Sequence, residues 1–315
     1  MKKLAVVAFG GNALLRGNEV GTIEQQEKNT YDACKSLLGL INSDYNIIIT
    51  HGNGPQVGNI LLKNEAGFNE FKLPKMPLDV CVADSQGQIG YMIERSMRNV
   101  LKEEGIDKNV VVIVSQVFVD KNDPAFENPT KPIGPFYLKE EADLITKSSK
   151  WVFKKDSKNR GWRRVVASPI PLGIMNTPVI KKLAEEGNIV IAVGGSGIPI
   201  YLHKNGYHEA IEAVIDKDLA SAFLAKEIDA DNFYIVTDVP KVCINFNTPS
   251  EQKLDRISVA EVKKLLHEGQ FPYGSMGPKV KAAILFAESS GKEAVITNQE
   301  ELELDNCGTR IYKSN

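Results

Sequence analysis

Three lysines stand in local settings that are unusual for a side chain that normally extends into solvent. Lys131 lies in a proline-rich segment, Lys217 between two aspartates at a predicted helix start, and Lys279 after a Gly-Pro pair in the first turn of another predicted helix. A lysine at a helix N-terminus opposes the helix dipole, which costs about 0.3–1 kcal/mol unless an anion is present. Each lysine alone could simply reach solvent. Together they favour phosphoryl transfer, in which lysines and Mg²⁺ neutralise the charge of the transferred group.

Glycine-rich turns follow three apolar segments. Residues 4–9 run into Gly10-Gly11-Asn12, residues 46–50 into His51-Gly52-Asn53-Gly54, and residues 188–193 into Gly194-Gly195-Ser196-Gly197. Such uninterrupted apolar segments predict strands buried on both faces, and glycines let bare backbone N–H groups approach a ligand. One such turn is no more than an ordinary strand-to-loop connection. Three predict an anion site at the carboxyl ends of parallel strands, where open α/β sheets bind their ligands.

Helical patterns alternate with these strands and must position the turns. Helices are predicted over residues 22–40, from Pro55 onward, over 84–104 and over 177–186, with a further strand at 109–115. Thr22 begins a capping box and Gly105 is a typical helix stop. The alternation predicts an α/β fold with a mainly parallel sheet and helices on both faces.

The alternation is interrupted between residues 120 and 168. The first part, 120–135, is rich in proline and asparagine and has no usable period. A short helix is predicted at 138–147, and the basic run at 154–164 is interpreted as a solvated hairpin tip. We interpret the segment as a protruding subdomain that moves as a lid and carries Lys131 to the site.

A second lobe follows within what we predict to be one domain of residues 1–315. Residues 1–200 would form the acceptor lobe, with the insertion at about 120–168, and residues 201–315 the nucleotide lobe. Helices are predicted from 217 to 227 and from 275 to about Gly291, and strands at 232–237, 293–297 and 309–313. Ser258 begins another capping box.

Composition excludes several classes of protein. The chain has 315 residues and a net charge of -2, which argues against a nucleic-acid-binding surface. Its four cysteines and four histidines show neither a disulfide frame nor metal-ligand spacing. No stretch is long enough to span a membrane and no signal peptide is evident, so we expect a cytoplasmic protein. Walker A, G-x-G-x-x-G and G-x-S-x-G motifs are absent.

Five blocks of this sequence resemble the signature blocks of the carbamate kinases, a group within the amino acid kinase superfamily. They are residues 8–14, 50–58, 128–134, 212–220 and 274–279, and they follow one another in the same order, with 161–166 between the third and fourth. The resemblance implies a three-layer α/β/α sandwich and a homodimer. It further implies reversible phosphoryl transfer between ATP and carbamate, giving ADP and carbamoyl phosphate, with Mg²⁺. The implied direction is toward ATP, in arginine catabolism.

The same resemblance implies roles for individual residues. Lys131, Lys217 and Lys279 would be catalytic, with Asp218 orienting them. The carbamoyl and phosphoryl groups would be held by Gly10, Gly11, Asn12, Gly52, Asn53, Gly54, Gly194 and Gly195. The nucleotide would contact Thr237, Asp238, Met276 and Gly277 beside Lys217 and Lys279. No protein ligand to a metal is implied, and carbamate is already an anionic nucleophile that requires no general base.

Some positions depart from the family pattern. Ser196 replaces the third glycine of a four-glycine run, and Val82 and Asp84 replace a small residue and a methionine before Ser85-Gln86-Gly87. Ala167 and Gln270 replace a proline and a histidine. Two alternatives therefore stay open: a related kinase of a small carboxylate or amino acid, and a catalytically silent nucleotide-binding sensor.

Overall fold

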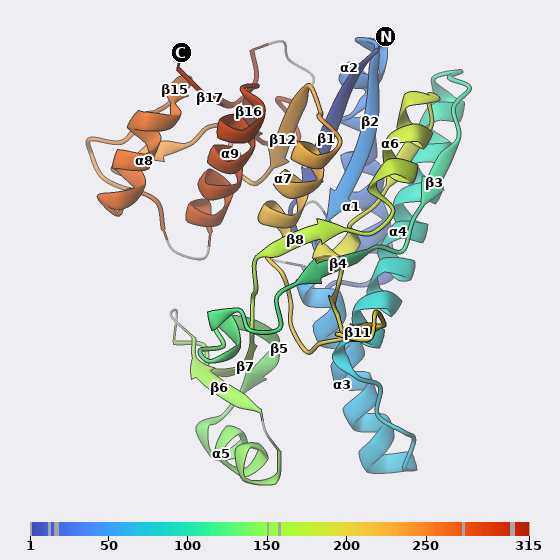
Figure 1. The fold of residues 1–315 in the computed structure, drawn as a ribbon, viewed down its shortest axis with the longest axis vertical. Helices are drawn as coiled ribbons and strands as arrows, with labels where there is room; N and C mark the ends of the chain where they lie inside the picture. The colour runs from blue at the N-terminus through green and yellow to red at the C-terminus, as the bar shows by residue number, and fades with distance from the viewer. Residues whose placement is uncertain are drawn as a thin grey trace.

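The computed structural model describes residues 2–11, 14–15, 19–149, 151–156, 159–272, 275–302 and 306–314. Its largest sheet is built from β1 (Lys3–Phe9), β2 (Tyr45–His51), β3 (Val110–Val112), β9 (Ile189–Ile191), β12 (Asn232–Val236), β15 (Arg256–Ser258), β16 (Ala294–Thr297) and β17 (Thr309–Tyr312). The order is β15-β17-β16-β12-β1-β2-β9-β3 (Figure 1). Only the β16–β17 pair in this sheet is antiparallel. The predicted α/β fold with a mainly parallel sheet is confirmed.

Helices cover both faces of this sheet. They are α1 (Ile23–Lys35), α2 (Leu38–Asn42), α4 (Leu78–Glu103), α6 (Thr177–Glu185), α7 (Lys217–Glu227), α8 (Val259–His267) and α9 (Met276–Ser290). Helix α3 (Gly54–Phe71) instead extends away from the sheet and packs on α4 and on β5 (Lys131–Tyr137) of the subdomain (Figure 1). Successive side chains of β1 point to opposite faces, as the pleat of a strand requires. Val6 and Ala8 join a hydrophobic cluster with residues of α6, α7, α8 and α9. Val7 and Phe9 join a second cluster with residues of α1, α2 and α4. The sheet is therefore the middle of three layers.

Several predicted boundaries were wrong. The helix predicted over 22–40 ends at Lys35 and resumes as α2, because Leu37 N–H bonds back three residues to Cys34 O and breaks the helical register. Helix α4 begins at Leu78 rather than at 84. The strand predicted over 109–115 is only the three residues of β3, which pairs with β9 alone at the edge of the sheet.

A smaller sheet lies beside the first, in the order β11-β10-β4-β8. Its strands are β4 (Gln116–Val119), β8 (Pro171–Ile174), β10 (Ile198–Leu202) and β11 (His208–Ala210). Two short pairing strands, β13 (Cys243–Ile244) and β14 (Gln252–Lys253), lie in the connection after β12. No helix in the described part of the chain is long and apolar enough to cross a membrane.

The interruption at 120–168 contains a separate three-stranded antiparallel sheet, β5-β7-β6, with one α-helix and a short 3-10 helix at Pro124–Phe126. Its elements are β5 (Lys131–Tyr137), α5 (Lys139–Ser148), β6 (Val152–Lys155) and β7 (Trp162–Val166), drawn in green and projecting from the main body in Figure 1. The segment 120–135 showed no usable period in the sequence, but its last residues form the start of a strand, because β5 begins at Lys131. Its prolines are tolerated since β5 is an edge strand, where a missing N–H need not break a ladder.

The basic run forms the expected hairpin of β6 and β7, apart from residues 157 and 158, which lie outside the described residues. It was wrong to expect all of its charges to be solvated. The Arg164 side chain is 6% exposed, lies 3.8 Å above the ring of Trp151 and is paired with Glu212. The subdomain also packs on α3, where a Cβ on Gly58 would lie 3.1 Å from Gly134 Cα of β5.

Candidate active site

The parallel register brings the glycine-rich turns to the same edge of the sheet. Gly10 N–H donates to Val236 O at 3.2 Å, and Gly52 N–H donates to Phe9 O at 3.3 Å. A Cβ on Gly52 would lie 3.4 Å from Cδ of Lys217 and 3.9 Å from the backbone nitrogen of Gly11. The first two turns therefore meet α7 at the ends of β1 and β2. Asn12, also expected here, lies outside the described residues.

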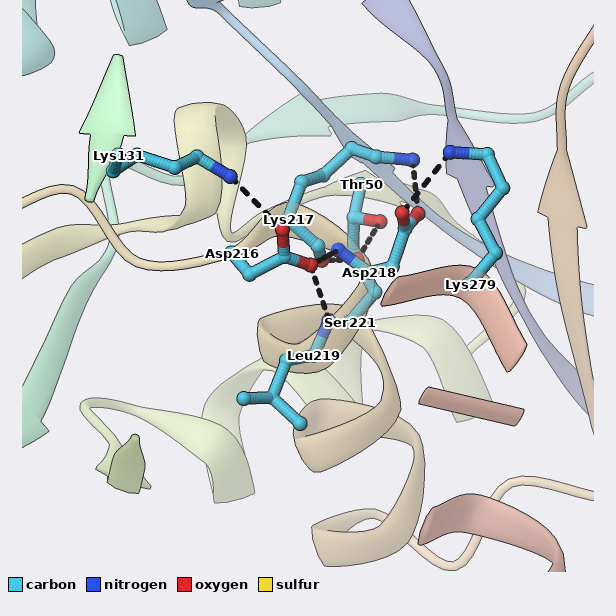
Figure 2. A network of polar contacts seen from close by, with 8 residues as sticks. All are labelled: Thr50, Lys131, Asp216, Lys217, Asp218, Leu219, Ser221 and Lys279. Atoms are coloured by element: carbon cyan, nitrogen blue, oxygen red, sulfur yellow. Dashed lines mark hydrogen bonds and ion pairs between the residues drawn. The ribbon is translucent and has the colours of Figure 1, made fainter. Parts of the chain in front are cut away.

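A cluster of lysines and aspartates lies at this edge (Figure 2). Lys217 Nζ is 2.6 Å from one oxygen of Asp218, and Lys279 Nζ is 3.1 Å from the other. Lys131 reaches in from β5 and lies 2.9 Å from Asp216 Oδ2. Five residues that span nearly half of the chain are thus brought together.

Asp216 links the helix to the subdomain. It is the N-cap of α7, and its Oδ1 accepts hydrogen bonds from the backbone N–H groups of Asp218 at 3.0 Å and Leu219 at 3.3 Å. Its other carboxylate oxygen accepts the hydrogen bond from Lys131. One carboxylate therefore caps the helix and holds the lysine of the subdomain.

The cluster is buried and strongly polarised. Asp218 is 5% exposed, and Lys217 and Lys279 are 12% and 16% exposed, so these two lysines do not simply reach solvent. Burial lowers the pKa of Lys217, and the Asp218 charge partly opposes this. Burial raises the pKa of Asp218, but the two ammonium groups outweigh it and hold the pKa at about 2. The carboxylate is therefore ionised at any pH at which the protein would work.

Two hydroxyl groups anchor the first turn of α7 to the sheet. Ser221 Oγ donates to the carbonyl of Lys217 at 2.7 Å and lies 2.6 Å from Thr50 Oγ1 at the end of β2 (Figure 2). Because both groups are fully buried, they fix the backbone from which Lys217 extends.

The N-terminus of α3 faces the same edge without a capping side chain. Asn53 occupies the N-cap position but accepts no hydrogen bond from the helix, and Gly54 and Pro55 follow it in the first turn. Apart from its chain neighbours and the backbone of its own helix, no described residue places a heavy atom within 4 Å of a Cβ built on Gly54. An uncapped helix N-terminus presents free N–H groups and a partial positive charge, which suits an anion.

The third glycine turn is strained and tightly packed. Val193, Gly195, Ser196 and Gly197 all have φ between 52° and 80°. A Cβ on Gly194 would lie 2.5 Å from His51 Nε2, and one on Gly195 would lie 2.3 Å from Asn53 Nδ2. Ser196 keeps φ at 78°, a value that favours glycine, which explains why glycine suits this position. Strain of this kind, about 1–3 kcal/mol per residue, is often concentrated at functional sites.

A cavity of about 340 Å³ opens beside Lys279. It is lined by Gly10, Gly11, Thr237, Asp238, Val239, Lys241, Cys243, Phe246, Pro272, Ser275, Met276 and Lys279. Six of these were expected from the sequence. Val239, Lys241, Cys243, Phe246, Pro272 and Ser275 were missed. Most of them lie in irregular connections without a pattern, whereas Cys243 belongs to the two-residue strand β13 and Ser275 to the motif block 274–279, where only its neighbours were assigned a role.

Two residues expected to contact a nucleotide do not line this cavity. Gly277 is the second residue of α9, and a Cβ there would lie 3.2 Å from the carbonyl oxygen of Pro272, so glycine is needed for close packing. Lys217 contacts Oδ1 of Asp218, whereas Lys279, which lines the cavity, contacts Oδ2. The cavity and the glycine turns therefore meet at the lysine cluster, with space for a nucleotide on one side of it.

Comparisons with known proteins agree with this arrangement. Residues 3–298 match the amino acid kinase family. Carbamate kinase of Pyrococcus furiosus is 48% identical over 96% of this chain and 95% of its own length. The carbamate kinase-like protein YahI of Escherichia coli is 46% identical over the full length of both chains. The structure of carbamate kinase from Giardia lamblia bound to AMP-PNP has a TM-score of 0.91 and 43% identity, covering 99% of each chain. The chain therefore belongs to the amino acid kinase family, within which it groups with the carbamate kinases.

Proposed function

We propose that this protein is a phosphotransferase that moves a phosphoryl group reversibly between ATP and carbamate. The observation that carries the proposal is the Asp218 carboxylate shared by Lys217 and Lys279, placed between the glycine turns and the 340 Å³ cavity. The names and high identity of the relatives support carbamate as the acceptor.

In this proposal the nucleotide occupies the cavity, with its terminal phosphate beside Lys279. The transferred phosphoryl group lies between the nucleotide and the glycine turns, where Lys217 and Lys279 stabilise its charge. Asp218 keeps both ammonium groups fixed, so little reorganisation is needed during the transfer. Lys131 completes the site from the subdomain.

No general base is required, because carbamate attacks as an anion. His51 is the titratable group that packs against the third turn, and burial lowers its pKa to about 4. A neutral imidazole with such a weak affinity for protons is a poor base at neutral pH.

The space on the acceptor side of the site favours a small substrate. His51 and Asn53 fill the space where side chains at 194 and 195 would lie. An amino acid acceptor would need room and a charged partner for its amino and carboxyl groups. The description of YahI as only carbamate kinase-like keeps a related carboxylate as the second candidate.

Mg²⁺ bound with the nucleotide is part of the proposal. The described residues contain no group of three or more His, Cys, Asp and Glu side chains that could hold a metal. In kinases Mg²⁺ is usually held mainly by phosphate oxygens and water, so the proposal requires no dedicated protein site. Asp238 at the cavity is the carboxylate that would contact its hydration shell.

Other parts of the proposal go further than the fold. We propose a homodimer working in the cytoplasm in arginine catabolism, mostly toward ATP, with lobes at 1–200 and 201–315. We also propose that the subdomain at about 120–168 moves as a lid. The ion pairs Lys131–Asp216 and Arg164–Glu212 are the contacts that would hold it closed.

The decisive experiment is an assay of ADP phosphorylation by carbamoyl phosphate, beside ATP-dependent phosphorylation of a panel of amino acids. We expect turnover with carbamoyl phosphate only, and activity with an amino acid alone would contradict the proposal. Lys217→Ala or Lys279→Ala should lower turnover about 10²–10³-fold, the usual loss for one donor aimed at developing charge. Nucleotide binding without turnover in either direction would favour the sensor.

A further inference from the structure

Ser85 on α4 lies beneath the acceptor turns and has no role in the proposal so far. It is fully buried, and its Oγ donates to the carbonyl oxygen of Val82 at 2.6 Å. The same Oγ lies 2.8 Å from Nδ2 of Asn53, the residue between Gly52 and Gly54. A serine 32 positions further along the chain thus contacts a predicted substrate-binding side chain.

The number of protons decides the direction of these two hydrogen bonds. A serine hydroxyl has one proton, and a carbonyl oxygen can only accept. Ser85 therefore gives its proton to Val82 and must accept from Asn53. It follows that the NH₂ group of the Asn53 carboxamide faces Ser85, and that its oxygen, Oδ1, faces the opposite way.

The surroundings of Asn53 leave that oxygen available. Asn53 is 4% exposed and stands at an N-cap position without capping the helix, so Oδ1 is not used by α3. Among the described residues, none donates a hydrogen bond to it. Gly195 packs closely against the carboxamide, since a Cβ there would lie 2.6 Å from Asn53 Cγ.

The neighbouring residue of α4 holds the opposite wall of the site. Gln86 Nε2 donates to Ser115 O at 3.0 Å, and Gln86 Oε1 accepts from Ser115 N–H at 2.8 Å. Ser115 Oγ in turn accepts from the backbone N–H of Val193 at 2.8 Å, at the start of the strained turn. One turn of α4 therefore fixes both Asn53 and the turn that packs on it.

We propose that Ser85 is a positioning residue that sets the Asn53 carboxamide with its oxygen toward the acceptor. The site then selects an acceptor that carries a hydrogen-bond donor on its carboxylate carbon, beside the oxygen that takes up the phosphoryl group. Carbamate has such a donor in its amino group, whereas acetate, of nearly the same shape, has a methyl group there. The inference rests on the proposed function and adds the group that distinguishes carbamate from a plain carboxylate.

The test compares two phosphoryl donors, carbamoyl phosphate and acetyl phosphate, with ADP as acceptor. In Ser85→Ala the constraint on Asn53 is lost and both orientations of its carboxamide become accessible. We expect kcat/KM for carbamoyl phosphate to fall about 3- to 10-fold, the usual effect of one hydrogen bond, and that for acetyl phosphate to change little. Where acetyl phosphate is not turned over, its inhibition constant against carbamoyl phosphate gives the same comparison.

Ser96→Ala is the matched control, because Ser96 is also a buried serine of α4, at 5% exposure. It should leave the preference for carbamoyl phosphate unchanged. Ser85→Cys, which keeps the size of the side chain and a weak donor, should give an intermediate preference and covers the case in which Ser85→Ala does not fold.

The outcomes separate the inference from the function on which it rests. Wild-type protein without activity on carbamoyl phosphate would contradict the proposed function itself. If the wild type is active, two results for Ser85→Ala would overturn the inference alone: an equal loss of kcat/KM for both donors, or no loss for either. A general loosening of the site would lower both activities, so only a change in preference supports the positioning role.

Discussion

Replacing Asp218 by asparagine tests the electrostatic core of the site most directly. The substitution keeps the shape of the side chain and removes the single charge that Lys217 and Lys279 share at 2.6 and 3.1 Å. The two ammonium groups would then lie close together, largely buried, without their carboxylate. We expect Asp218→Asn to be destabilised and to lose activity for the same reason.

The magnitude follows from the burial of the pair. Removing one partner of a buried ion pair costs about 3–5 kcal/mol, because it leaves an uncompensated charge. At roughly 2 °C per kcal/mol for a chain of this size, the melting temperature should fall by roughly 6–10 °C. Catalytic turnover should also fall, since the lysines are no longer held in position.

The pH dependence gives a second measure. The Asp218 charge is the main influence that raises the pKa of Lys217, while burial and Lys279 lower it. Without Asp218 this pKa falls further, so the alkaline limb of the pH–rate profile should move to lower pH. Above the new pKa the folded state no longer carries the unpaired charge, whereas the unfolded lysine is still protonated. The free energy of unfolding of Asp218→Asn therefore rises with pH relative to that of wild type, and the difference between the two melting temperatures narrows.

The assay is thermal melting from pH 6 to 10 together with pH–rate profiles for carbamoyl phosphate and ADP. Asp229→Asn is the control, because Asp229 forms an exposed pair with Lys292 at 2.8 Å and is 73% exposed. It should change stability by less than about 1 kcal/mol and leave the profile in place. An Asp218→Asn variant that melts within about 2 °C of wild type and keeps the alkaline limb would refute the reasoning.

Three further predictions concern the walls of the site and the subdomain. Gly195→Ala should raise KM for carbamoyl phosphate at least about tenfold and lower the melting temperature, because the new Cβ would lie 2.3 Å from Asn53 Nδ2 and the residue has φ of 59°. Gly87→Ala is the control and should change neither, because a Cβ there meets no atom within 4 Å outside its own helix. Burial lowers the pKa of His51 to about 4, so the unfolded chain binds a proton that the folded chain rejects, and wild type should lose up to about 3 kcal/mol between pH 6.5 and 4. In His51→Asn the free energy of unfolding should fall less steeply between pH 6.5 and 4, because one proton fewer is taken up on unfolding. The same slope as in wild type would contradict the assignment to His51. Carbamoyl phosphate with ADP should slow hydrogen exchange in β5 and β7 of wild type but less in Lys131→Ala, and identical exchange with and without ligand would argue against a lid.

The sequence by itself determined the features that depend on neighbours along the chain. The buried strand at 4–9, the capping boxes at Thr22 and Ser258, and the helix end at Gly291 are all present in the structure. Each follows from side-chain period or from a backbone group that must be satisfied within one turn. The order of the motif blocks was enough to identify the family, although it fixed no contact between them.

The tertiary structure alone decided which groups meet. The sequence placed Asp216 and Asp218 on either side of Lys217 but could not show that one binds Lys131, 85 residues away, and the other Lys279, 61 residues away. It also gave no sign that Ser85 fixes Asn53, or that residues 239–246 help to line the cavity. Contacts of this kind leave no period in the sequence. They arise because parallel strands bring the ends of distant segments to one edge of a sheet, where each buried charge or amide must find its partner.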